Sequence, residues 1–369
     1  MHFPFPSTSA LRSGFCLHRV VWALLVSILL PASSHGIEPI WGARGFWNFQ
    51  TSGGAIRLLH QEFLQVPDDW RSQSGALGLN LEREKDPDKP WFIEYQRLGG
   101  EFVQAGLAEK NDEAVEWGLK ILEYGFSRMD REGSFPQPDR YHSASFFIEA
   151  AARALLLLQA APGGDRWKDA ADRLRPKVAQ AAHWMARPDV HADNWPDPAL
   201  IETKWGERRY GHRRYLDAAA LGLTGILIRD TKLVDVSREI LRDGLSFQRP
   251  DGVSPEKGGH DSSYQAVGLM YACRYYQMVA DRTVRREMEP ILQKGFAWMV
   301  SRIRPDGTIE DIGNTRTGPG AELGRRGKPK TVDFQATAMC LAHWGWLNQD
   351  EKLQKEAQRV LEAGQKKKP

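Results

Sequence analysis

The stretch RPDGVSPEKGGHDSSYQAVGLMYACRYY, Arg249–Tyr276, indicates the fold more clearly than any other part of the chain. Its first half is a loop rich in turn-forming residues and ionisable side chains. Its second half, from Ser263 onward, has the pattern of a helix that is apolar on nearly every side. Such a helix must be enclosed by the rest of the protein, so the segment is predicted to be a buried inner helix.

The loop that opens this stretch belongs to a repeat. RPDG occurs at 249–252 and again at 304–307, ARPD ends at Asp189, and SRMDREG around Asp130 is a weaker copy. The aspartates of successive copies are 59, 62 and 55 residues apart. Repeats of this length are typical of chains that stack one supersecondary unit several times.

Each repeat contains the same succession of elements. An amphipathic helix comes first, as in residues 165–185, whose apolar positions form one stripe while charged residues occupy the other face. A long loop follows, and then a nearly all-apolar helix. The four predicted inner helices are residues 143–160, 215–228, 263–280 and 333–347. Short turns lead from each inner helix to the next outer one.

This alternation predicts an all-α fold. Enclosed inner helices, solvated outer helices, long loops on one face and short turns on the other are the pattern of an (α/α) toroid. Strand signals are scarce. We expect an incomplete barrel of about five to seven helical hairpins, one of them supplied by residues 37–110. Residues 37–369 are predicted to form this single catalytic domain.

Residues 1–36 are predicted to be a signal peptide. They carry Arg12 and Arg19 and no acidic residue, followed by the apolar run VVWALLVSILL and the small-residue stretch PASSHG. The apolar run is too short to span a bilayer comfortably, although an uncleaved membrane anchor stays an alternative. We therefore expect a secreted or periplasmic protein without stable membrane insertion after the signal peptide is removed.

Composition excludes several classes of partner and cofactor. The 50 Lys and Arg nearly balance the 47 Asp and Glu, which gives no indication of a nucleic-acid partner. Cys273 and Cys340 lie in apolar helical patterns and fit either a disulfide or two buried thiols. The sequence has no P-loop, dinucleotide-binding glycine pattern, HExxH or GxSxG motif. No cofactor and no metal site are predicted, and no oligomeric state follows from the sequence.

The long loops are expected to converge on one cleft. Each delivers its residues to the N-terminus of an inner helix, where unpaired backbone N–H groups and the helix dipole favour anions. Three of these loops place a histidine just ahead of the helix, namely His142, His212 and His260. Cations and tryptophans are concentrated in the same loops. In a nearly neutral chain this concentration predicts an anionic ligand, and flat indole rings suit stacking on sugars.

An extended anionic polymer of sugar rings is a uronate-containing polysaccharide. Its cleavage by β-elimination needs a base for the C5 proton and an acid for the leaving oxygen at C4, once the adjacent carboxylate is neutralised. A tyrosine serves as both if nearby positive charge lowers its pKa from about 10. Tyr264 follows Lys257 and His260 closely and is expected to face His212 from the adjacent hairpin. Tyr264, His212 and His260 are therefore the candidate catalytic residues.

Two short segments carry a resemblance to a known family. GHRRYLDAAALG at 211–222 and EKGGHDSSYQAVGL at 256–269 resemble the toroid-fold polysaccharide lyases, most closely the bacterial alginate and glucuronan lyases. The resemblance implies that a tyrosine, here Tyr264, is acid and base. It also implies that a histidine, here His212, and an arginine or asparagine hold the carboxylate, without an obligatory metal.

The asparagine of that pattern has no direct counterpart in this chain. PQPDRYHSAS at 136–145 contains none, so Gln137, His142, Asn194 or Asn314 would have to take its place. The candidate residues for binding an acidic polysaccharide are Gln137, Tyr141, His142, Trp195, Arg208, Arg209, Lys257, Asn314 and Arg316.

Two other functions fit the same scaffold. A glycoside hydrolase would need two carboxyl groups flanking the scissile bond, separated by roughly 5 to 9.5 Å. The candidates for that pair are Glu202, Glu256, Asp261, Glu310 and Asp311. A non-catalytic glycan-binding protein would bind the polymer tightly and leave its length unchanged.

Overall fold

Helices make up the fold, and the described residues form isolated β-bridges but no strand. The structure is a computed structural model that describes residues 39–65, 70, 72–137, 139–193, 204–205 and 209–367. The helices belong to one unit, Glu38–Pro369. The predicted signal peptide, residues 1–36, lies outside the described residues.

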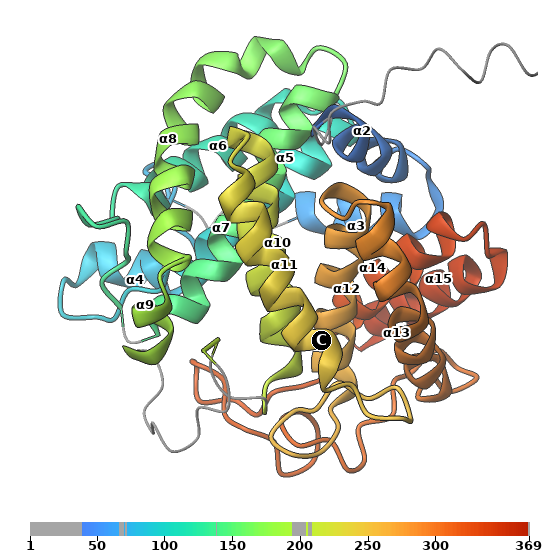
Figure 1. Cartoon of the computed structure of the whole chain (residues 1–369). Coiled ribbons are helices and arrows are strands. Elements are labelled where there is room, and N and C mark those ends of the chain that lie inside the picture. The colour runs from blue at the N-terminus through green and yellow to red at the C-terminus, as the bar shows by residue number, and fades with distance from the viewer. Residues whose placement is uncertain are drawn as a thin grey trace, which may run out of the picture. The chain divides into compact units, whose positions relative to one another are not determined.

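The helices follow one another along the chain as in Figure 1. Their bounds are α2 Pro39–Gln50, α3 Gly54–Leu64, α4 Leu79–Lys85, η2 Ile93–Arg97, α5 Leu98–Ala108, α6 Asp112–Phe126, α7 Arg140–Ala160, η3 Gly164–Trp167, α8 Lys168–Met185, α9 Pro188–Asp193, α10 Gly211–Ile228, α11 Thr231–Ser246, α12 Ser262–Met278, α13 Arg282–Ser301, α14 Phe334–Leu347 and α15 Glu351–Lys366. The predicted inner helices 143–160, 215–228, 263–280 and 333–347 correspond to α7, α10, α12 and α14.

Six of the described helices form a ring in which each contacts the next. Their order is α3, α5, α7, α10, α12 and α14, and α14 returns to α3. Helices α6, α8, α11, α13 and α15 pack on the outside, each against the ring helix before it. The prediction of an all-α toroid is therefore confirmed. Residues 37–110 supply two neighbouring ring helices, α3 and α5, and α5 forms its hairpin with α6 because only a short turn separates them.

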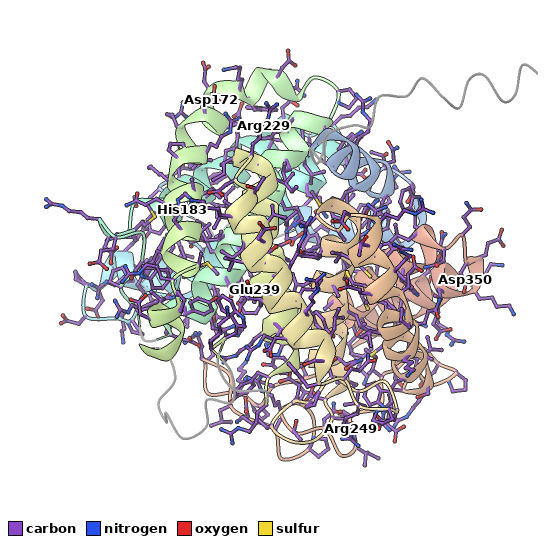
Figure 2. The ribbon with its side chains drawn as sticks, viewed as in Figure 1. Asp172, His183, Arg229, Glu239, Arg249 and Asp350 are labelled. Carbon is purple, nitrogen blue, oxygen red and sulfur yellow. The ribbon has the colours of Figure 1, made fainter. Side chains whose placement is uncertain are left out.

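Inner and outer helices differ as their sequence patterns predict. Nearly every side chain of α7 and α10 is buried, whereas α8, α11 and α15 bury one stripe. Figure 2 shows charged side chains on the outer helices, among them Asp172 and His183 on α8 and Glu239 on α11. Helix α7 is long and apolar enough to cross a membrane, yet 89% of its apolar window is buried within the protein. It is a core helix of the ring.

Three of the hairpins share one turn between the inner and the outer helix. The N–H of Asn111, Asp230 or Asp350 donates to the carbonyl five residues earlier, that of Gly106, Gly225 or Gly345, at 2.8 Å in each case. The side chain of the same Asn or Asp then caps the outer helix. The repeated spacing of glycine and cap explains why these hairpins are alike.

The RPDG repeats are structural turns that follow outer helices. Gly252 has φ +93°, and a Cβ there would lie 2.4 Å from the carbonyl oxygen of Lys294 on α13. Gly307 has φ +82°, and a Cβ there would lie 2.5 Å from the carbonyl oxygen of Arg359 on α15. Only glycine fits this left-handed conformation and this close approach. Each RPDG turn thus fastens a long loop to the next outer helix.

The two ends of the ring are different. Arg229 in a short turn and Arg249 at the start of a long loop lie at opposite ends of α11 (Figure 2). At the short-turn end, α2 packs across the ring, with Gly42 against the backbone of Met278 and Phe49 stacked on His343 at 4.4 Å. The long loops gather at the other end (Figure 1). Of the two alternatives for Cys273 and Cys340, the structure has buried free thiols.

Candidate functional site

A cavity of about 760 Å³ opens at the long-loop end of the ring. First-turn residues of α5, α7, α10, α12 and α14 line it, together with Phe63 from the C-terminal end of α3. A separate hollow of about 830 Å³, formed mainly by α7, η3 and α8, contains no histidine or tyrosine. The cavity at the inner-helix N-termini, called the cleft below, is therefore the candidate site.

A row of rings forms one wall of the cleft. The rings of Tyr264 on α12 and His212 on α10 have centroids 4.6 Å apart. His142 on α7 lies 5.5 Å from His212 and 4.8 Å from Phe146, and Phe146 lies 6.0 Å from Tyr271 on α12. The neighbouring positions of α7, α10 and α12 in the ring bring these side chains together.

Two cations surround the side chain of Tyr264. The guanidinium carbon of Arg316 lies 3.7 Å from the centroid of the phenol ring. Lys330 donates a hydrogen bond from Nζ to the Tyr264 hydroxyl at 3.2 Å. Positive charge at both the face and the hydroxyl of a phenol stabilises the negative charge that appears when its proton leaves. The sequence predicted Lys257 beside Tyr264, but Lys257 pairs with Glu322 and is exposed.

Glu322 holds these cations in place. Its carboxylate accepts from Lys330 Nζ at 2.6 Å and from Arg316 Nε at 3.2 Å, and it also pairs with Lys257. Burial raises the pKa of Glu322, but hydrogen bonds from Lys257 and Lys330 and the charge of Arg316 outweigh burial and lower the pKa to about 2. Glu322 is therefore ionised throughout the physiological pH range.

Asp261 accepts hydrogen bonds from the backbone of both Tyr264 and Arg316. One carboxylate oxygen accepts from the backbone N–H of Tyr264 at 3.1 Å, as the N-cap of α12. The other accepts from the backbone N–H of Arg316 at 2.8 Å and of Thr317 at 2.9 Å. A single buried carboxylate thus ties the helix that carries Tyr264 to the loop that carries Arg316.

Glu256 orients His212. The backbone N–H of Gly211 donates to the Pro255 carbonyl at 2.8 Å, which brings the loop 254–260 against the start of α10. Glu256 Oε1 then lies 2.5 Å from His212 Nδ1, and Arg316 Nη1 lies 3.2 Å from Glu256 Oε2. Because a carboxylate only accepts, Nδ1 carries the proton and Nε2 keeps its lone pair. Nε2 of His212 is buried and has no partner among the described residues.

Burial favours the neutral form of both histidines in the row. Burial lowers the pKa of His212 below its ordinary value, Glu256 opposes this shift, and Arg316 and Arg213 add to it. Burial lowers the pKa of His142 well below its ordinary value, and Arg213, His212, Arg316 and Arg97 lower it further. Nδ1 of His142 is buried without a hydrogen-bond partner among the described residues.

A loop crosses the cleft and closes one side of it. Residues 318–331, called the strap below, are joined at their base by the N–H of Gly318, which donates to the Lys330 carbonyl at 3.0 Å, and nearer their tip by the bridge of Leu323 and Pro329. Arg325 of the strap pairs with Glu94, donates to Ser143 at 3.3 Å and lies 4.2 Å from the ring centroid of Phe92. The strap thus connects α12, through Lys330 and Tyr264, with η2 and α7, through Arg325.

The floor of the cleft is an ionic network. Arg274 on α12 donates to both carboxylate oxygens of Glu149 on α7, at 3.0 and 3.1 Å. Arg153 donates to Glu149 at 3.0 Å and to Glu101 on α5 at 2.7 Å. Two arginines thus balance two glutamates at the floor, and their hydrogen bonds join three ring helices.

The cleft is less cationic than the sequence predicts. Its basic lining residues are Arg97, Arg213, Arg274, Arg316, Arg325 and Lys330, and its acidic lining residues are Glu94, Glu101, Asp139, Glu149 and Asp333. Arg274, Arg325 and Lys330 are paired with carboxylates, as is Arg316. The concentration of charge seen along the sequence was misleading because acids from other helices meet these cations only in the folded ring.

The predicted site residues divide into three groups. Tyr264, His142 and Arg316 line the cleft, and His212 lies directly behind Tyr264. Trp195 and Arg208, like Asn194 and Glu202, lie outside the described residues. The structure places the remaining predicted residues, which are His260, Gln137, Tyr141, Arg209, Lys257 and Asn314, away from the lining of the cleft.

The residues away from the cleft have structural contacts instead. His260 packs against Trp298, and Tyr141 is buried beside Trp184. Gln137 accepts from the N–H of Ile93 at 2.6 Å. Asn314 accepts from the N–H of Ser262 at 3.0 Å, and its amide donates to Ser262 and Thr317. These contacts occupy the polar groups of Gln137 and Asn314, whereas Nε2 of His260 is buried without a hydrogen-bond partner among the described residues.

Sequence reasoning missed Arg97 and Glu322. Arg97 lies directly before α5, where a residue reaches the cleft in the same way as His142 at the start of α7. Recognition of residues 98–108 as a further inner helix would have found it. Glu322 gives no local signal, since its partners lie on separate parts of the loops. The described residues contain no group of three or more His, Cys, Asp and Glu that could hold a metal ion.

Comparison with known proteins supports the fold. The sequence matches no protein-family model and no curated protein. A tyrosine-to-alanine variant of a chondroitin AC lyase from Streptomyces coelicolor A3 has a similar structure, with a TM-score of 0.52, 13% identity and coverage of 90% of this chain. The match covers 49% of that lyase, so this chain spans about half of its length. A second solved structure, a polysaccharide lyase, has a TM-score of 0.48 and 13% identity over 85% of this chain and 90% of its own. The chain therefore shares its helical toroid fold with the chondroitin AC lyase.

Proposed function

We propose that the protein is a polysaccharide lyase that cleaves a uronate-containing polymer by β-elimination. The observation that carries this proposal is the set of side chains around Tyr264. Its side chain lies in the cleft with Lys330 at the hydroxyl, Arg316 over the ring and the neutral His212 beside it. A phenol held between cations and an unprotonated imidazole is suited to give up a proton and to take one back.

The elimination would begin with Tyr264 as its phenolate. The phenolate oxygen takes the proton from C5 of the uronate, the electron pair of that C–H bond forms the C4–C5 double bond, and the bond from C4 to the leaving oxygen breaks. Tyr264 then returns its proton to that oxygen. Lys330 and Arg316 stabilise the phenolate, and arginines of the cleft are suited to bind the carboxylate whose charge grows as C5 loses its proton.

The geometry favours a different role for His212 from the one that the family resemblance implies. With its proton on Nδ1 towards Glu256, His212 presents a lone pair at Nε2 and not a donor. A lone pair cannot stabilise a substrate carboxylate, but it can accept the proton of a hydroxyl that comes within hydrogen-bond distance during the reaction. We therefore assign His212 to the proton transfer of Tyr264, and carboxylate binding to the arginines.

The carboxylates of the structure do not favour a glycoside hydrolase. Asp261 and Glu256 are occupied by backbone N–H groups, His212 and Arg316. Glu310 and Asp311 lie away from the lining of the cleft. The acids that do line the cleft include Glu94, Glu101 and Glu149, each of which is paired with arginine.

The resemblance to alginate and glucuronan lyases supports a uronate polymer as substrate, and the N-terminal sequence supports secretion or export to the periplasm. The test is incubation of the purified protein with alginate, glucuronan, pectate and hyaluronan, with ultraviolet absorbance as the readout. Elimination creates a double bond conjugated to the carboxylate and raises the absorbance. Hydrolysis shortens the polymer without that change, and a binding protein changes neither.

Replacement of Tyr264 by phenylalanine tests the role of its hydroxyl. Tyr264→Phe keeps the ring against His212 and Arg316 but removes the proton carrier. We expect kcat to fall by about 10²–10⁴-fold while polymer binding and Tm stay close to wild type. Tyr276→Phe is the matched control, because Tyr276 lies further along α12 and donates to Glu289 at 2.7 Å. Near-normal turnover by Tyr264→Phe would show that another group moves the proton.

A further inference from the structure

Arg97 differs from the other arginines at the floor and the strap of the cleft. Arg274 and Arg325 are both held by carboxylates, at the floor and under the strap. The guanidinium of Arg97 makes no hydrogen bond or ion pair with any residue that the structure describes. Its contact is with the ring of Phe146, whose centroid lies 4.5 Å from the guanidinium carbon. A guanidinium stacked on an aromatic ring keeps its N–H edge available for a ligand.

The position of Arg97 is separate from that of Tyr264. Phe146 follows His142 by about one turn of α7, so the aromatic ring that Arg97 stacks on lies deeper along the cleft wall than His142. Phe146 also contacts Tyr271, which follows Tyr264 by two turns of α12. One helical turn is similar to the length of one sugar ring in a polymer. Arg97 thus lies deeper along the cleft wall than Tyr264, where a neighbouring ring of a bound polymer would reach it.

The charges around Arg97 leave it available for an anion. Glu101 and Glu149 at the floor are balanced by Arg153 and Arg274. Glu94 is occupied by Arg325. Asp333 caps the N-terminus of α14 through the N–H of Ala336 at 2.8 Å, where the helix dipole offsets its charge. The positive charge of Arg97 is therefore not matched by a paired carboxylate.

We propose that Arg97 binds the carboxylate of a second uronate, on the sugar ring next to the one that Tyr264 acts on. This inference rests on the proposed lyase function and deepens it. It assigns the protein to polymers in which consecutive rings carry a carboxylate, and it disfavours polymers in which charged and neutral rings alternate. Arg97 is a specificity-determining residue in this assignment, since it touches substrate but no reacting atom.

The experiment compares Arg97→Gln and Arg97→Lys with the wild-type protein on two polymers. Polyglucuronate has a carboxylate on every ring, and hyaluronan has one on every second ring. We expect Arg97→Gln to raise KM for polyglucuronate by about tenfold to a hundredfold with a smaller effect on kcat, and to leave binding of hyaluronan nearly unchanged. The KM of Arg97→Lys for polyglucuronate should lie between those of the wild type and Arg97→Gln, because lysine keeps the positive charge but lacks the planar fork of the guanidinium.

Two controls separate substrate binding from structure. Arg242→Gln removes the same charge from α11, where Arg242 pairs with Glu287 at 2.9 Å, and should leave KM unchanged. The Tm of Arg97→Gln should match wild type, since no ion pair is lost. An unchanged KM on polyglucuronate, or an equal loss on both polymers, would overturn the proposal.

The result also distinguishes this proposal from the lyase function. If unsaturated product forms and Arg97→Gln binds polyglucuronate as wild type does, the second carboxylate site is wrong and the lyase function stands. If no unsaturated product forms from any polymer, yet Arg97→Gln weakens binding of polyglucuronate alone, the elimination is wrong and the site stands.

Discussion

At the scale of single residues, most ionisable groups at the mouth of α12 build the site and do not react. Asp261 ties Tyr264 to Arg316 through backbone N–H groups, and Glu256 sets the tautomer of His212. Glu322 gathers the cations around Tyr264. Such carboxylates position other groups by accepting several hydrogen bonds at once, because an ionised carboxylate is stable in a buried place only when its lone pairs are satisfied.

Asp217 is a buried carboxylate with fewer hydrogen-bond partners than these. It lies on α10, is 3% exposed, and has one oxygen without a hydrogen-bond partner among the described residues. Burial raises its pKa from 3.8 to about 7, while the charge of Arg214 and a hydrogen bond from Ser145 oppose the shift. The native state therefore holds a proton on Asp217 between about pH 4 and pH 7 that the unfolded chain has released.

Asp217→Asn is expected to change the pH dependence of stability. The folded protein binds the extra proton, so the wild type loses stability as the pH rises from about 4 to 7, by on the order of 4 kcal/mol from this group. The asparagine variant lacks this loss. The free energy of unfolding of the variant minus that of the wild type should therefore be larger at pH 8 than at pH 4. Urea unfolding at the two pH values measures the difference. A constant difference between variant and wild type would contradict the raised pKa.

At the scale of elements, the ends of the helices determine what reaches the cleft. Inner helices begin at the long-loop end, so the first turns of α7, α10 and α12 supply His142, His212 and Tyr264. Short turns with a cap at the other end keep the hairpins alike. The position of the strap depends on contacts far apart in sequence, since Arg325 reaches Glu94 across 231 residues.

Loss of the Glu94 carboxylate should release the strap. Glu94→Gln removes the charged partner of Arg325, and a partly buried hydrogen bond to a charged group contributes about 1.5 kcal/mol or more. We expect trypsin to cleave after Arg325 or Arg326 roughly tenfold faster than in wild type, because the strap opens more often. Limited trypsin digestion with mass spectrometry locates the cuts.

The matched control for the strap is Glu287→Gln, which breaks an ion pair with Arg242 between outer helices. It should not change cleavage within residues 318–331. Equal cleavage rates in Glu94→Gln and wild type would mean that Ser143 and Phe92 hold Arg325 without the ion pair.

At the scale of the whole molecule, the ring is joined by charge as well as by apolar packing. The ionic network of the floor links α5, α7 and α12, which α2 also contacts. Arg153 and Arg274 are among the largest fully buried side chains of the described residues. A buried network of this kind holds helices in a specific register, and the removal of one member leaves the others unpaired.

Glu149→Gln is therefore expected to destabilise the protein. It leaves Arg153 and Arg274 without their shared carboxylate in a buried place, which costs about 3–5 kcal/mol. The control is Glu123→Gln, whose exposed pair with Arg173 should contribute about 0–1 kcal/mol. Urea unfolding of both variants measures the contrast. Similar stabilities for the two variants would show that the network adds little to the ring.

The sequence by itself determined the inner helices α7, α10, α12 and α14 and the toroid that they build. Apolar periodicity separated inner from outer helices, and loop lengths indicated which ends face the cleft, because both are local properties of the chain. That was sufficient to predict the toroid and the meeting of Tyr264 with His212.

Only the tertiary structure decided which charged groups face one another. Lys330 lies at Tyr264 where Lys257 was expected, His260 packs against Trp298, and Arg97 reaches the cleft while Arg325 is occupied by Glu94. The paths of the long loops and the closure of the ring set these contacts. They join residues from distant parts of the chain, so no local pattern records them.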